Sequence, residues 1–131
     1  MIMTCRDIYE SALALLGESP NGENSSDYTE RAPYLIAVLC GLLAETDQRF
    51  RTEHGRPAQG TVPDMKLELS EIFPLCNEFA PAAAFYLASM LIFDSDGDRA
   101  DALFEQYTEI CKNIVDGFSY KCEKIINKYR I

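Results

Sequence analysis

Residues 80–107 constrain the fold of this chain most, because they read as two helices joined by a very short turn. The first helix contains the run Pro-Ala-Ala-Ala-Phe-Tyr-Leu-Ala-Ser-Met-Leu-Ile, and the second begins at Asp96 or Gly97 with apolar residues three or four positions apart. The turn reads Asp-Ser-Asp-Gly-Asp, and a connection this short favours antiparallel packing. Alanines at positions 82, 83, 84 and 88 leave room for neighbouring helices. The segment therefore predicts a helical hairpin built for packing.

A first helix is predicted over residues 6–16, whose apolar residues recur on one side. Thr4 is its expected N-cap, and Asp7, three positions later, completes a capping box. Gly17 is expected to end the helix, since glycine tolerates the left-handed conformation common at that position.

A second helix is predicted from residues 27–30, Asp-Tyr-Thr-Glu, which form another capping pattern beginning at Asp27, to about Arg51. Either the helix begins near Ala32, with Pro33 in its first turn, or it kinks at Pro33. Gly41 costs about 1 kcal/mol relative to alanine inside a helix and permits a close helix contact. This segment is apolar on most sides, so it is expected to be the central element. Its candidate core residues are Tyr28, Leu35, Val38, Leu39, Leu42, Leu43 and Phe50.

Residues 52–66 contain two prolines and two glycines without periodicity, which predicts a long, mobile loop. The alternation of apolar and charged residues over 65–69 favours a short extended segment, and residues 70–76 are expected to form a turn or short helix. A third helix is predicted over 78–93 with Asn77 as its cap. The fourth keeps its period to Asp116, after which Gly117 either lies within one long helix or bends it into a C-terminal arm over 116–131.

These segments predict a single all-α domain over residues 1–131, a compact bundle of about four main helices with a C-terminal helical extension. The five cysteines are scattered without paired spacing, which indicates reduced, mostly buried thiols. The start of the chain lacks the pattern of a signal peptide, and no apolar run is long enough for a membrane span. The expectation is a soluble intracellular protein.

The net charge of −9 opposes binding to a phosphate backbone. The charge is uneven, because residues 112–131 hold five positive and two negative side chains, a local net charge of +3. Either these cations complement the dipole at the C-terminus of a helix, or the basic tail meets the acidic body of a neighbouring copy.

Candidate catalytic and metal-binding groups are sparse in the sequence. The turn at 94–98 resembles a calcium loop, but placing Gly97 at position six of an EF-hand puts Ile92 and Leu103 at ligand positions one and twelve. His54 is the sole histidine and has no cysteine at ligand spacing. Acidic pairs such as Glu68 with Glu71 and Glu105 with Glu109 are interpreted as solvent-exposed surface residues rather than as metal ligands. A non-enzymatic protein without a catalytic residue, cofactor or metal is therefore expected.

The order of these features resembles the small head-to-tail connector proteins (head completion, adaptor or neck) of tailed bacteriophages and prophages. The resemblance covers residues 8–114 and lies in the Ala-Leu-Ala-Leu-Leu-Gly helix, the Arg-Ala-Pro-Tyr-Leu-Ile helix, the Phe-Ala-Pro-Ala start of the hairpin and its Asp-x-Asp-Gly-Asp-Arg-Ala turn. It implies a subunit of a homo-oligomeric ring, usually dodecameric, that binds the portal protein and tail or neck proteins. Such a ring belongs to the virion neck, is assembled in the bacterial cytoplasm and lets DNA pass without binding it specifically.

An interface role is predicted on this basis for basic residues, while the acidic side chains are expected to line the channel. The candidate subunit or portal contacts are Arg51, Arg56, Lys121, Lys124, Lys128 and Arg130. The alternative is a small acidic regulatory module that takes a peptide or hydrophobic ligand in a groove between helices two and three.

Overall fold

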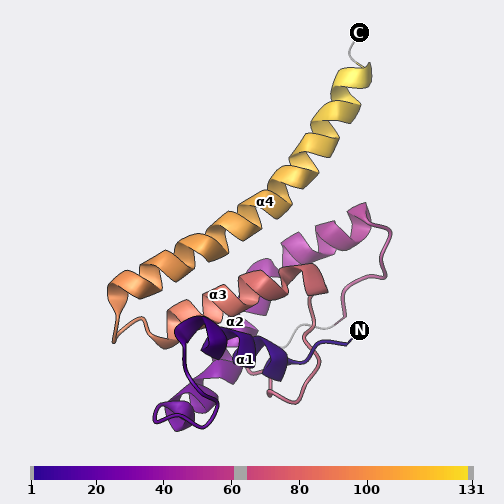
Figure 1. Ribbon diagram of the computed structural model, residues 1–131. Helices are drawn as coiled ribbons and strands as arrows, with labels where there is room; N and C mark the ends of the chain where they lie inside the picture. Colours follow the sequence, from indigo (N-terminus) through magenta and orange to yellow (C-terminus); the bar gives the residue numbers. More distant parts are fainter. Residues whose placement is uncertain (1, 61–64, 130–131) are drawn as a thin grey trace.

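The computed structural model describes the backbone of residues 2–60 and 65–129, and the side chains of the last helix up to residue 118. The helices are α1 (Cys5–Leu16), α2 (Ser25–Glu53), α3 (Ala80–Leu91) and α4 (Gly97–Tyr129), with a 3-10 turn, η1 (Asn77–Phe79), before α3. Within these residues no β-strand forms, and Figure 1 shows the helices gathered around α3. The predicted all-α bundle is confirmed.

Helix α1 has the predicted ends. The Thr4 hydroxyl accepts a hydrogen bond from the Asp7 N–H at 3.3 Å, and the Asp7 carboxylate accepts one from the Thr4 N–H at 2.9 Å. Gly17 ends the helix with a φ of 70°, which L side chains rarely adopt. Local sequence alone accounts for this helix, because both caps are contacts between near neighbours.

Helix α2 begins earlier than predicted, and the expected capping box at Asp27 is wrong. The chain turns near Gly22, whose carbonyl accepts a hydrogen bond from the Ser25 N–H, so Asp27 already lies in the first turn. Pro33 lies inside the helix, which excludes a start near Ala32. The Pro33 carbonyl also accepts a hydrogen bond from the Leu67 N–H at 3.0 Å, which ties the returning chain to α2.

Helix α3, and not α2, is the central element. Nine of its 12 residues are buried, and it packs against α1, α2 and α4. Its alanines allow three neighbours to approach one short helix. Val38 and Leu42, expected in the core, lie on the solvent face of α2, and Leu35 is half-buried.

The predicted cap at Asn77 is also wrong, because this residue starts the 3-10 turn η1 that precedes α3. Pro81 lies in the first turn of α3, where its missing N–H would have no helical partner. Residues 65–76 form no strand and no helix. The alternation of apolar and charged residues still matches the burial, since Leu67 and Leu69 are buried while Lys66 and Glu68 are exposed.

The start of α1 holds this segment in place. The Cys5 N–H donates to the Glu71 carbonyl at 2.9 Å, and the Arg6 N–H donates to the Leu69 carbonyl at 2.8 Å. In the other direction, the Phe73 N–H donates to the Met3 carbonyl at 2.8 Å. Backbone contacts with α1 therefore take the place of a sheet.

Helix α4 runs without interruption through Gly117, so the two alternatives resolve in favour of one long helix. It returns along α3, and its C-terminal end extends past α2 and α3 in Figure 1. The thiols of Cys5, Cys40 and Cys76 are free and buried and that of Cys111 is free and half-buried, whereas the Cys122 side chain lies outside the described part. Among the described residues, no helix combines the length and apolar character needed to span a membrane.

Candidate functional site

The most distinctive surface is an apolar stripe on the solvent face of α2. Tyr34, Val38 and Leu42, four positions apart, are 48%, 49% and 60% exposed. They lie opposite the buried face that carries Ile36 and Cys40, because the helical repeat puts these two groups on opposite sides. We call these three residues the outer stripe.

Acidic residues flank the outer stripe. Asp27 and Glu30 precede it, Glu45 follows it on the same face of the helix, and all three are exposed. Asp27 is ion-paired with Arg31 at 2.9 Å. The stripe thus has acidic groups at both ends.

Gly41 lies beside the outer stripe and is exposed. A Cβ atom built at this position would meet no atom within 4 Å, so no close contact inside the described subunit requires glycine. The residue nevertheless costs the helix about 1 kcal/mol relative to alanine. Close helix packing through Gly41, expected from the sequence, does not occur among the described residues.

Arg51 has an internal role beside a buried carboxylate. Asp47 is 0% exposed, and one of its oxygens accepts hydrogen bonds from Arg51 Nε at 2.8 Å and from Gln59 Nε2 at 2.7 Å. Its other oxygen accepts one from the Cys76 N–H at 2.8 Å. Arg51 Nη1 and Nη2 also donate to the carbonyls of Pro57 and Pro74, which leaves this arginine only 15% exposed.

Arg56 forms a two-point ion pair with Glu78, with N–O distances of 2.6 and 2.7 Å, and its guanidinium lies over the Phe50 ring. This pairing lowers the pKa of the Glu78 carboxyl below its ordinary value. The residues predicted to form a mobile loop up to position 60 are therefore fastened to α2 and η1, while residues 61–64 lie outside the described part. An interface role for Arg56 stays a prediction.

The predicted basic contacts at the C-terminus lie outside the described side chains. The backbone of α4 includes Lys121, Lys124 and Lys128, and Arg130 lies beyond the described backbone. The structure brings Arg51 and Arg56 to the same end of α2, and their grouping with the C-terminal basic residues stays a prediction.

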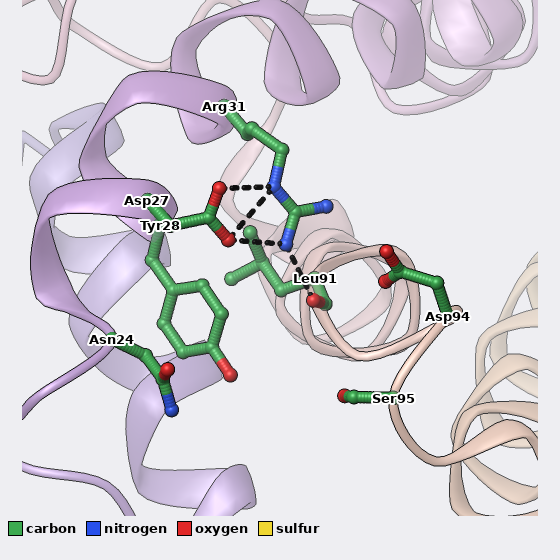
Figure 2. Close-up of a pocket in the computed structure, with 7 residues that line it drawn as sticks. All are labelled: Asn24, Asp27, Tyr28, Arg31, Leu91, Asp94 and Ser95. Atoms are coloured by element: carbon green, nitrogen blue, oxygen red, sulfur yellow. Dashed lines mark hydrogen bonds and ion pairs between the residues drawn. The ribbon is translucent and has the colours of Figure 1, made fainter.

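A polar pocket lies between the start of α2 and the turn after α3, with a cavity volume of about 320 Å³ (Figure 2). Arg31 Nη2 donates to the Leu91 carbonyl at 2.6 Å, and Nη1 donates to the Met90 carbonyl at 3.3 Å. These carbonyls belong to the last turn of α3, which has no helical partner for them and carries a partial negative charge. The pocket is lined by Asn24, Asp27, Tyr28, Arg31, Leu91, Asp94 and Ser95.

The remaining sequence candidates have structural partners. The His54 ring stacks on Phe50 with centroids 4.0 Å apart, at the C-terminal end of α2. Asp96 Oδ1 accepts a hydrogen bond from the Arg99 N–H at 3.2 Å, so the turn at 94–98 caps α4. Across the described residues, no three histidine, cysteine or acidic side chains gather closely enough to hold a metal ion.

Sequence reasoning missed Asp47 and Arg31. The signal for Asp47 was its position on the apolar face of α2, four residues after Leu43 and four before Arg51. Arg31 carried no comparable signal, because its carbonyl partners are 59 and 60 positions away.

Comparison with protein-family models, with curated proteins and with solved structures found no match to this chain.

Proposed function

We propose that this protein is a structural subunit of the head-to-tail connector of a tailed bacteriophage or prophage, where it docks on the portal as a ring and leaves a channel for DNA. The observation that carries the proposal is the outer stripe of Tyr34, Val38 and Leu42. Apolar side chains grouped on the solvent face of a helix are typical of surfaces that another protein covers. A helical subunit with such a face is suited to assembly.

The charge of the chain supports the same role. A net charge of −9 keeps the surface from holding DNA, which suits a channel wall along which DNA must slide. The acidic body would line that channel. The basic residues 121–130 would then serve contacts between proteins.

The test mixes the purified chain with the portal protein encoded in the same genome and measures the mass of the complex by light scattering. The expected result is a ring that co-migrates with the portal and binds no double-stranded DNA at low salt. A chain that stays separate from the portal at every concentration contradicts the proposal. Deleting the gene from an inducible prophage should leave DNA-filled heads without tails, and normal infectious particles would contradict it as well.

The alternative, a regulatory module with a ligand groove between the second and third helices, would use the pocket in Figure 2. The lining of that pocket is mostly polar, and Arg31 within it already bonds Asp27 and two α3 carbonyls. This arrangement favours a structural role for the pocket over capture of an apolar ligand.

A further inference from the structure

We infer that the outer stripe on α2 binds residues 119–131, which we call the arm, of a second copy of this chain. The inference rests on the proposed ring for its setting and names the contact that joins neighbouring copies. Four observations support it: the exposed stripe, the position of Gly41, the charges at the ends of the stripe, and the direction of α4.

The stripe and the arm match in length and pattern. Tyr34 and Leu42 are eight residues apart, which is about 12 Å along a helix. In the arm, Cys122, Ile125, Ile126 and Tyr129 have the spacing of one helix face over seven residues, about 10 Å. Two helical segments with apolar faces of about two turns each can cover one another.

The charges complement one another. Residues 119–131 hold four positive side chains and one negative, a net charge of +3, whereas Asp27, Glu30 and Glu45 flank the stripe on the outer face of α2. Pairing the stripe with the same stripe of another copy would instead bring the acidic ends together. The Lys66 ammonium also lies 5.4 Å from the Tyr34 ring centroid and Arg31 pairs with Asp27, but Glu30 and Glu45 still favour the basic arm over a second α2 as the occupant.

Gly41 has a role in this contact that it lacks within the subunit. Its missing side chain leaves a flat place beside Val38 and Leu42, with open space above it. A partner helix can approach the α2 backbone more closely there than over any other residue. The contact thus explains a glycine that weakens the isolated helix.

The direction of α4 makes the partner a second copy. Phe118 packs near Phe50, with ring centroids 6.1 Å apart, and α2 ends three residues later at Glu53. Because α4 continues as a helix to Tyr129, its last turns run past the end of α2 and beyond the other helices (Figure 1). The arm of one subunit is therefore placed to reach another.

The decisive experiment is a cross-link between two kinds of purified chain at high concentration, without portal. One is tagged and carries Val38→Cys with Cys122→Ser, and the other is the unaltered chain with its native Cys122. A short bifunctional maleimide should join them into a heterodimer. The band should disappear when the untagged chain carries Cys122→Ser, and also when the new cysteine replaces Phe93, which is exposed but lies off the stripe.

Absence of the heterodimer overturns the inference. So does a band that survives Cys122→Ser in the untagged chain, or a product that joins only two tagged chains, which would mean that α2 pairs with α2. The portal is absent from this experiment, so a negative cross-linking result would not contradict the proposed connector function. Conversely, a chain that does not bind the portal could still form the cross-link, so the two proposals are tested separately.

Gly41→Ala provides a second, independent test with two readouts. The alanine should raise the melting temperature of the dilute monomer, since it removes the helix penalty of glycine. It should also weaken self-association measured by light scattering about tenfold, because a methyl group then separates the two helices. Gly117→Ala is the matched control, since a Cβ there also meets no atom within 4 Å but the position lies outside the stripe and outside residues 119–131. Equal self-association of both variants would overturn the role of Gly41.

Discussion

The Asp47 carboxylate accepts a hydrogen bond from the Cys76 N–H at 2.8 Å, which joins the C-terminal part of α2 to the segment that leads into α3. The same carboxylate holds Arg51 and Gln59. One buried acid therefore organises three parts of the chain that differ in sequence position by up to 29 residues.

Replacing this acid is expected to be strongly destabilising. Asp47→Ala leaves the largely buried Arg51 guanidinium without its carboxylate and should lower the free energy of unfolding by about 3 kcal/mol. Chemical denaturation measures the change, and hydrogen exchange at the Gln59 amide should rise together with it. Glu45→Ala is the control, since this acid is exposed on the same helix. A similar, small effect of both substitutions would contradict the assigned role of Asp47.

Arg31 is expected to stabilise the end of α3. Arg31→Ala removes the donors of the Met90 and Leu91 carbonyls and should cost about 1.5–3 kcal/mol, the range for hydrogen bonds with a charged partner. Asp27→Ala removes the exposed ion pair alone and should cost less than about 1 kcal/mol. Thermal unfolding of the two variants gives the comparison. Equal losses would show that the bonds to α3 contribute nothing beyond the ion pair.

Tyr9 is 2% exposed, and its hydroxyl has no hydrogen-bond partner among the described residues. Tyr9→Phe should therefore keep or raise the free energy of unfolding, by up to about 1 kcal/mol, because it removes a buried polar group that lacks a partner. Tyr28→Phe is the matched control, since burial and the nearby Glu18 carboxylate raise the pKa of that hydroxyl, and removing it should be destabilising. The Tyr9→Phe variant should have the higher melting temperature of the two. A large loss of stability in Tyr9→Phe would mean that the Tyr9 hydroxyl does have a hydrogen-bond partner.

The raised pKa values of two buried thiols predict that the stability of the fold depends on pH in the alkaline range. Burial raises the pKa of Cys5 to about 11, with the Glu71 charge adding to the effect, and burial raises the pKa of Cys40 to about 12. Between the ordinary thiol pKa of 9.0 and these values, the unfolded chain loses protons that the folded chain keeps. The free energy of unfolding should therefore fall as pH rises above 9, by about 1 kcal/mol per thiol at pH 10.

The double variant Cys5→Ala, Cys40→Ala isolates this effect. Its stability will be lower throughout because of the space left in the core, but its slope between pH 9 and pH 11 should be shallower than that of the unaltered chain. Denaturant titrations at a series of pH values give the slopes. Parallel slopes would show that these thiols do not contribute to the alkaline loss.

Local sequence determined the features that depend on near neighbours. The capping box of Thr4 and Asp7 and the left-handed Gly17 use groups within one turn, so their pattern predicts both ends of α1. The short turn before Gly97 likewise determined that α4 returns along α3. The helical fold class followed from periodicity in the same way.

Tertiary structure decided which side of each helix is covered and which polar groups meet. The apolar residues around α2 predicted burial on most sides, yet Val38 and Leu42 are exposed, because the alanines of α3 brought the other helices to that element instead. The hydrogen bonds that join Asp47 to Cys76 and Arg31 to Leu91 span 29 and 60 positions, and no local spacing encodes such contacts. A sequence carries the periodicity that makes a helix, but the direction of its apolar face is determined by the competition among all the elements for the same core.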